Sequence, residues 1–337
     1  MNNKVKNILV AVSSALVFAA CATTQQAPTI MSVSVPEEGG IKFIKVTSKE
    51  DAVRSAEVTN NADGSISFVP RRFFDISKDG SLVAFMANKG DKVNIYLKDL
   101  TGGRAVVQRT FRDNVVDPAF SPDGKLLAFS DYRDGSWNIY TIGAESGSAV
   151  RQISISNQNE YYPVFSPDGK ILVFVQNESQ YYNGQYITRS YIWSYEMEKG
   201  ILTQYVEGNL PVFTPDGKKL VFSRPSKDTG KYELWTFDFN TGQESIILTQ
   251  KDKGLSLASV SPDGRRVAFV STSTGKNVPR NYDIFLVNID GTNLTQLTFH
   301  PGHDLCPIWS PDGKSIYFLS QRGGEGGEYN IWRMDLR

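Results

Sequence analysis

The sequence contains little cysteine and histidine and has no excess of either charge. Its 337 residues include two Cys, two His, 36 Lys plus Arg and 36 Asp plus Glu. Two cysteines cannot build a disulfide framework or a four-thiolate zinc site. A balanced charge gives no basic field that would attract nucleic acid, so no nucleic-acid partner is expected. A hydrophobic fraction of 40% is too high for a disordered chain.

Long apolar runs are also missing, and no stretch reaches the roughly 20 residues that a transmembrane helix needs. Near the start, Lys4 and Lys6 precede the uncharged stretch Ile8–Ala20, which is the pattern of a secretory signal. The stretch ends in Ala19-Ala20-Cys21, and this ending resembles the lipobox of bacterial lipoproteins. The resemblance implies cleavage before Cys21 and lipidation of its thiol. The alternative is an ordinary secretory signal with an incidental Cys.

We therefore predict a lipoprotein signal peptide over residues 1–20 and a flexible tether with lipidated Cys21 over residues 21–40. The tether has no apolar period and contains two Pro and a Gly pair. Several acyl chains together hold a protein stably on a membrane. Ala22 follows the Cys where an Asp would favour the inner membrane, so we expect an outer-membrane protein that faces the periplasm. Its only membrane contact would be the lipid anchor.

Six copies of one unit fill residues 41–337. In each copy an Asp-Gly pair follows Ser or Thr, and the copies recur at intervals of roughly 45 residues. Each copy also has a Phe shortly after the Gly and an aliphatic–aromatic pair further along. The six turns are Ser77–Gly80, Ser121–Gly124, Ser166–Gly169, Thr214–Gly217, Ser261–Gly264 and Ser310–Gly313.

The residue types of one unit indicate its structure. Pro presets φ for a turn, Asp bonds nearby backbone amides, and Gly accepts the left-handed position that closes the hairpin. The segment after a turn, such as Leu126–Phe129, is apolar at consecutive positions and must be covered on both faces. Four short strands per unit are typical of a propeller blade. We predict an all-β, six-bladed β-propeller of four-stranded antiparallel blades.

The two ends of the repeat region indicate how the ring closes. The last unit stops after its third strand, and Ile41–Thr47 is a strand candidate without a unit of its own. We expect this N-terminal strand to become the outer strand of the last blade. Residues 50–70 are then in excess, and Asp63-Gly64 within them suggests a small extra hairpin without an assigned place.

The repeated Ser-Pro-Asp-Gly-Lys-x-Leu/Ile-x-Phe resembles the WD-repeat-like propeller repeat of TolB-like proteins in the bacterial envelope. The resemblance covers roughly residues 41–337 and implies the fold and an envelope location. TolB carries an α/β domain before its propeller and is not a lipoprotein. The chain therefore resembles a TolB-like propeller lipoprotein and not TolB itself, and binding to Pal is not implied.

Candidate catalytic and metal-binding motifs are weak. His300 and His303 with Asp304 match a zinc site poorly, because zinc enzymes use three protein ligands. The six turn Asp residues are expected to form turns and not a ring of ligands. No Gly-x-Ser-x-Gly elbow or phosphate-cradling loop occurs, and Cys306 is expected to be a small buried residue. We predict no catalytic residue, no cofactor and no metal site.

The connections between second and third strands are unequal in length. Asn177–Arg189 in the third unit and Ser271–Tyr282 in the fifth are long, and both should share a face with the inter-blade loops. Tyr and Arg are common anchors of protein interfaces. We predict that this loop face, and not the face of the Asp-Gly turns, binds a partner through Tyr181, Tyr182, Tyr186, Arg189, Arg280 and His303.

Two functions are compatible with these residues. The first is a non-catalytic envelope scaffold with a monomeric body, which binds a protein or a peptidoglycan-associated partner. The alternative is a glycan-binding or glycan-active propeller, a lyase or hydrolase, that uses the central cleft. The scarcity of His and the absence of a nucleophile motif favour the scaffold.

Overall fold

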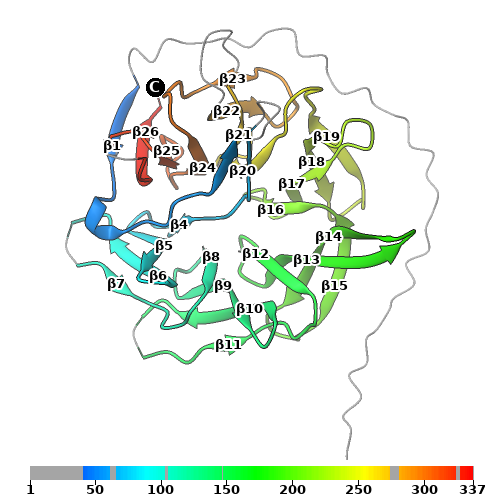
Figure 1. The fold of residues 1–337 in the computed structure, drawn as a ribbon, viewed down its shortest axis with the longest axis horizontal. Helices are drawn as coiled ribbons and strands as arrows, with labels where there is room; N and C mark the ends of the chain where they lie inside the picture. The colour runs from blue at the N-terminus through cyan, green and yellow to red at the C-terminus, as the bar shows by residue number, and fades with distance from the viewer. Residues whose placement is uncertain are drawn as a thin grey trace, which may run out of the picture.

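The computed structural model describes residues 41–60, 66–102, 105–145, 147–273, 281–323 and 327–336. Its strands form six four-stranded antiparallel sheets around a central axis (Figure 1). The predicted six-bladed propeller is confirmed. Within these ranges no helix is both long and apolar enough to cross a membrane; the only helix is the short 3-10 helix η1 (Lys49–Asp51).

Blades 1 to 5 each use four consecutive strands, which follow one another from the axis outward. Blade 1 contains β4 (Phe74–Ile76), β5 (Leu82–Lys89), β6 (Lys92–Asp99) and β7 (Val107–Gln108). Blade 2 contains β8 (Val115–Phe120), β9 (Leu126–Arg133), β10 (Ser136–Gly143) and β11 (Arg151–Gln152). Blade 3 contains β12 (Asn159–Phe165), β13 (Ile171–Tyr182), β14 (Gln185–Glu196) and β15 (Leu202–Glu207). Blade 4 contains β16 (Asn209–Phe213), β17 (Lys219–Pro225), β18 (Tyr232–Asp238) and β19 (Glu244–Leu248), and blade 5 contains β20 (Ser256–Val260), β21 (Arg266–Thr272), β22 (Tyr282–Asn288) and β23 (Thr295–Gln296).

Blade 6 closes the ring as predicted. It combines β24 (Asp304–Trp309), β25 (Ser315–Ser320) and β26 (Asn330–Asp335) with the N-terminal strand β1 (Lys42–Lys45). Thr47, just after β1, accepts the backbone N–H of Ile331 on its hydroxyl at 2.8 Å. The hydroxyls of Thr110, Ser154 and Thr298 accept the corresponding N–H in blades 1, 2 and 5. The N-terminal strand therefore reproduces the local bonding of an ordinary outer strand.

Each Asp-Gly turn is held by its own side chains. In blade 2 the Ser121 hydroxyl donates to Asp123 at 2.6 Å and accepts the backbone N–H of Leu126 at 2.9 Å. The bond from Ser121 lowers the pKa of Asp123. The φ angle of Gly124 is 70°, a backbone conformation that would be strained in a residue with a side chain. Because these bonds are local, the same residues produce the same turn in every blade.

The core lies between neighbouring blades. The Phe that follows each turn is at most 1% exposed, since the blades on either side cover both faces of its strand. These residues are Phe85, Phe129, Phe174, Phe222, Phe269 and Phe318.

The excess segment forms the predicted small hairpin, β2 (Val58–Asn60) and β3 (Ile66–Phe68). We call residues 66–73, which lead from this hairpin into blade 1, the strap. The ring of Phe68 packs against Tyr282 of blade 5 with centroids 4.5 Å apart, and Tyr162 of blade 3 donates to the carbonyl of Pro70 at 2.7 Å. The strap therefore crosses the centre of the loop face, which is the face opposite the Asp-Gly turns.

Candidate functional site

The most prominent feature of the loop face is a two-stranded extension of blade 3. Strands β13 and β14 have 12 residues each, but their neighbours β12 and β15 pair with them only as far as Asn177 and Tyr191. We call residues 178–189, which continue beyond these points, the arm. It reaches past the rim of the propeller (Figure 1). The sequence predicted a long connection for this segment, whereas it is almost entirely strand.

A two-residue turn at Asn183-Gly184 makes the arm regular. Both residues have positive φ, 48° and 82°. This is the backbone of a type I′ turn, whose twist matches that of the flanking strands, and Asn-Gly is its preferred sequence. The turn sets Tyr181 opposite Tyr186 and Tyr182 opposite Gln185.

One side of the arm presents two aromatic rings to solvent. Tyr181 and Tyr186 are 67% and 76% exposed, and their rings pack at 5.0 Å between centroids. One step closer to the body, the hydroxyls of Ser179 and Thr188 lie 2.8 Å apart. We call these four residues the tyrosine face.

The other side of the arm combines polar and apolar side chains, among them the 43% exposed Ile187. Glu178 pairs with Arg189 across the strands, and Gln180 pairs with Ile187. Together with Tyr191 they line a depression of about 360 Å³. A hydrogen bond to Tyr191 raises the pKa of Arg189.

The structure brings together only part of the predicted partner-binding set. Tyr181, Tyr186 and Arg189 share the arm, on its two sides. Tyr182 belongs to β13, and its side chain lies outside the described part of the structure, as do the whole of Arg280 and Cys21.

His303 lies away from the arm, between blades 5 and 6. Its Nδ1 accepts the backbone N–H of Tyr282 at 3.2 Å, and its own backbone N–H donates to Gln321. Burial lowers the pKa of this imidazole. His303 thus fastens two loops together. Among the described residues no group of three or more His, Cys, Asp or Glu is arranged to hold a metal ion.

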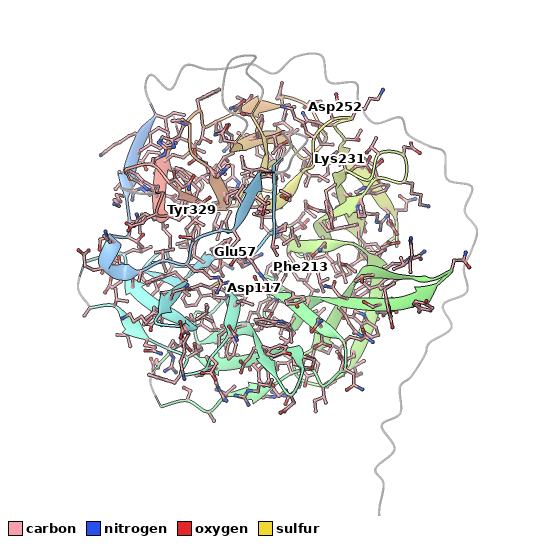
Figure 2. The ribbon with its side chains drawn as sticks, in the orientation of Figure 1. Glu57, Asp117, Phe213, Lys231, Asp252 and Tyr329 are labelled. Carbon is pink, nitrogen blue, oxygen red and sulfur yellow. The ribbon has the colours of Figure 1, made fainter. Side chains whose placement is uncertain are left out.

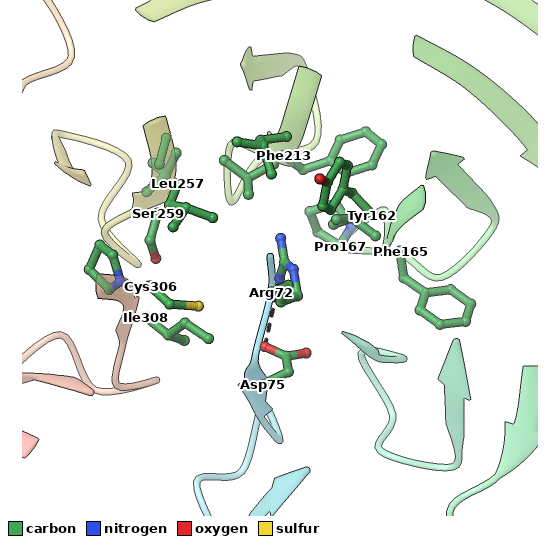
Figure 3. A pocket seen from close by; sticks show the side chains of 16 residues that line it. Arg72, Asp75, Tyr162, Phe165, Pro167, Phe213, Leu257, Ser259, Cys306 and Ile308 are labelled. Atoms are coloured by element: carbon green, nitrogen blue, oxygen red, sulfur yellow. Dashed lines mark ion pairs between the residues drawn. The ribbon is translucent and has the colours of Figure 1, made fainter. Parts of the chain in front are cut away.

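A cavity of about 250 Å³ runs along the propeller axis (Figure 3). Its wall comes from the inner strands, where a bulge in each of five blades holds one residue at positive φ. Such a backbone costs a non-glycine residue on the order of 1 kcal/mol. These residues are Asp117, Tyr162, Leu210, Leu257 and Cys306, with φ between 52° and 59°. The last four line the cavity.

The strap covers the loop-face end of this cavity. Arg71 forms an ion pair with the fully buried Asp117 at 3.2 Å, and its guanidinium lies 4.7 Å from the ring of Tyr161. Asp117 and Phe213 lie close to the axis (Figure 2). The cavity wall extends the other way to Pro167, in an Asp-Gly turn. A ligand would therefore enter from the turn face, whereas the sequence predicted binding at the loop face.

The cavity contains one ion pair among mostly apolar side chains. Arg72 and Asp75 form an ion pair at 3.8 Å, which Figure 3 marks with a dashed line. Asp75 also accepts the backbone N–H of Phe120 at 2.8 Å. Burial raises the pKa of Asp75. Neither residue stood out in the sequence. Arg72 lies in the strap, which belongs to no repeat, and Asp75 lies in β4 of blade 1, outside the turn and Phe positions that define the repeat.

Blades 5 and 6 share a second buried polar cluster, of which only Asp304 stood out in the sequence. Asp283 is 1% exposed and accepts from Gln296 at 3.1 Å, while Asp304 forms an ion pair with Arg322 at 2.9 Å. Burial, with the Asp304 carboxylate as the next cause, raises the pKa of Asp283 to about 8. Asp283 occupies the position in its repeat that Asn94 occupies in the first one. An acid where another repeat has an amide was the sequence feature that could have pointed to this cluster.

The sequence of the chain matches one known protein family over most of its length. The family described as TolB beta propeller domain matches residues 47–278 and 196–336. The chain belongs to this family. The predicted resemblance to TolB-like propellers is thereby confirmed.

Curated relatives match parts of the chain. The Tol-Pal system protein TolB of Francisella tularensis subsp. tularensis is 30% identical over 134 residues, which is 40% of this chain and 29% of the relative. The uncharacterized peptidase YuxL of Bacillus subtilis is 32% identical over 100 residues, which is 30% of this chain and 14% of the relative. The match with each of these relatives spans less than a third of the relative's length.

Solved structures share the fold at lower identity. A putative TolB from Agrobacterium tumefaciens has a TM-score of 0.56 and 20% identity, and the match covers 88% of this chain and 98% of that one. An oligogalacturonate lyase from Vibrio parahaemolyticus has the same TM-score and coverage at 14% identity. One fold thus occurs in proteins named for different roles, and the function must be argued from surfaces.

Proposed function

We propose that the protein is a non-catalytic scaffold of the bacterial cell envelope that binds a protein partner through the arm of blade 3. A lipid on Cys21 would hold it on the outer membrane, facing the periplasm. The lipobox-like ending of the first apolar stretch and the Tol-Pal relative support this location. The body would be monomeric.

The observation that carries the proposal is the exposed aromatic pair on an extension that the fold does not need. Blade 3 is complete where β12 and β15 pair with β13 and β14, so the residues beyond add nothing to its core. Tyr181 and Tyr186 nevertheless stand in solvent at 67% and 76% exposure. Tyrosine supplies a large contact area with few rotatable bonds and is enriched at interface hot spots.

The test is partner capture with a matched pair of variants. Tyr181→Ala combined with Tyr186→Ala should lower recovery of envelope proteins crosslinked to the scaffold, while the melting temperature stays within a few degrees. Tyr132→Ala is the control, because Tyr132 is 46% exposed on the same face but lies in blade 2. Equal recovery with the double variant and the control would contradict the proposal.

A second candidate function, binding of an acidic sugar, is favoured by the Arg72–Asp75 pair inside the axial cavity. The likeness to an oligogalacturonate lyase suggests the probe. The cavity, at about 250 Å³, is below the roughly 300–1,000 Å³ of most small-molecule sites, which places this candidate second. Calorimetry with oligogalacturonate would support it if saturable heat disappears in Arg72→Met. The absence of heat with the wild-type protein would count against it.

A further inference from the structure

We infer that the partner adds a β-strand to the outer edge of the arm, along β14, and pairs with the backbone of Tyr186 and Thr188. This inference rests on the proposed function and specifies the kind of partner. The partner would present an extended, uncharged segment, and not a helix or a folded surface alone.

The two-residue turn decides which backbone groups are free. In such a hairpin the residues that flank the turn, Tyr182 and Gln185, exchange both backbone hydrogen bonds. The pattern alternates, so the pairs Tyr181 with Tyr186 and Ser179 with Thr188 direct their N–H and C=O groups outward. The same alternation holds at the base of the arm, where the outward carbonyl of Ser190 accepts the N–H of Gly208 at 2.8 Å.

The edge of the arm lacks the usual protection against strand pairing. Residues 179–188 contain no charged residue and no proline. Proteins normally place charges or proline on exposed edges, because an open edge pairs with other chains. Each of the other five connections between second and third strands carries charge. Examples, one from each of these connections, are Asp91, Asp134, Lys227, Lys276 and Glu328. The uncharged edge of blade 3 is therefore suited to pairing.

The free edge and the exposed rings coincide. The residues whose backbone points outward on β14, Tyr186 and Thr188, are the same residues whose side chains form half of the tyrosine face. A strand laid beside β14 would set its own side chains against these two as cross-strand neighbours, at about 4.5–5.5 Å between Cβ atoms. Backbone pairing and aromatic packing would then act on one partner segment.

The outer edge is favoured over the inner one by topology. The edge of β14 lies on the side of β15, the outermost strand of blade 3, and the arm extends past the rim there (Figure 1). The edge of β13 lies on the side of β12 and the axis. An added strand along β14 therefore meets no other blade.

A second copy of this chain is a poor occupant of the edge. From Gln185 to Thr188 the uncharged edge is only about 14 Å long. Two such edges paired with one another would bury far less than the roughly 1,200 Å² of a stable complex. A different protein that pairs with the edge and also covers the tyrosine face can reach that area.

The test uses proline to remove one outward N–H. Thr188→Pro deletes the donor without breaking the β13–β14 ladder, because the Thr188 N–H points away from β13. Thr188→Val is the matched control, which keeps the N–H and loses only the hydroxyl contact with Ser179. Ser179→Pro makes the equivalent change on the inner edge. Melting curves establish that each variant is folded.

The probe is the extended peptide acetyl-Thr-Tyr-Thr-Val-Thr-Tyr-Thr-amide, titrated into the mature protein. We expect saturable binding that slows amide hydrogen exchange at Tyr186 and Thr188. Among the variants, only Thr188→Pro should lose affinity, by about five- to tenfold, which is the loss expected from removing one hydrogen bond. Unchanged affinity in Thr188→Pro overturns the inference. So does slowed exchange at Ser179 and Tyr181 instead, or no saturable binding by the wild-type protein. The exchange pattern needs no variant and decides the question if the proline variant fails to fold.

Failure of this inference and failure of the proposed function are distinguishable. If Thr188→Pro still captures the envelope partner and the Tyr181→Ala, Tyr186→Ala double variant does not, the partner binds the rings without adding a strand. If both Thr188→Pro and the double variant still capture it, the arm is not the binding surface.

Discussion

Replacing Asp283 with Asn should change how the stability of the propeller depends on pH. The Asp283 carboxyl is 1% exposed and shares the interior with Asp304, but the nearby guanidinium of Arg322 is already paired with Asp304. Burial and the neighbouring carboxylate raise the pKa of Asp283 from 3.8 to about 8. The folded protein therefore keeps a proton on Asp283 at neutral pH.

The sign of the effect follows from proton counting. Between pH 4 and about 8 the unfolded chain has released this proton while the folded chain still binds it. Stability therefore falls as pH rises through this window, by up to about 1.4 kcal/mol per pH unit from this group. Asn cannot titrate. Between pH 5 and pH 7 the variant should gain roughly 2–3 kcal/mol relative to the wild-type protein.

The assay is urea unfolding of both proteins at pH 5, 6 and 7. The substitution also changes the hydrogen bonds to Asn281 and Gln296, which shifts the free energy of unfolding by the same amount at every pH. The quantity to compare is therefore how the difference in unfolding free energy between variant and wild type changes with pH. Glu160 and Asp131, whose pKa values burial raises to about 7 and about 6, are present in both proteins and cancel. Asp252→Asn, at an exposed position, is the control. Parallel curves for Asp283→Asn and wild type would refute the reasoning.

Three further changes test the fold and the anchor. Phe129→Ala should cost roughly 3–5 kcal/mol in chemical unfolding, because it opens a cavity between blades; a cost below about 1 kcal/mol would contradict this packing. Thr47→Val should cost about 1–3 kcal/mol, since the buried N–H of Ile331 loses its acceptor, and an unchanged melting temperature would show that closure does not depend on this bond. Cys21→Ser should leave a precursor or a soluble periplasmic form in cell fractionation, and unchanged membrane association would refute lipidation.

The fold could be predicted from the sequence because its determinants are local and repeated. The bonds of Ser121 to Asp123 and Leu126 span at most five residues, and equivalent residues recur in every blade. Closure could be predicted by counting strands, since the last unit lacked one and Ile41–Thr47 was unassigned. Both arguments needed only the order of residues along the chain.

The candidate site could be predicted only in part. The tyrosines are visible in the sequence, but a loop was predicted for the arm although Asn183-Gly184 between alternating residues is a hairpin signal. The strap could not be placed, because its partners, Asp117, Tyr162 and Tyr282, lie in three different blades. No local pattern encodes such contacts. His303 was predicted to bind a partner, but in the structure its hydrogen bonds to Tyr282 and Gln321 connect two loops.

The pairing of β1 with β26 has a consequence for the order in which the molecule is made. Lys42 and Asp335 are neighbours in the closed ring but lie at opposite ends of the propeller sequence. During synthesis the first strand of the propeller must therefore wait for its last one, and until then β26 has an open edge and blade 6 lacks its outer strand. Closing so long a loop costs entropy that grows only logarithmically with its length, but contacts of this range form slowly. The unclosed ring should be the species most prone to aggregate, and chaperones would protect the chain most before β1 pairs with β26.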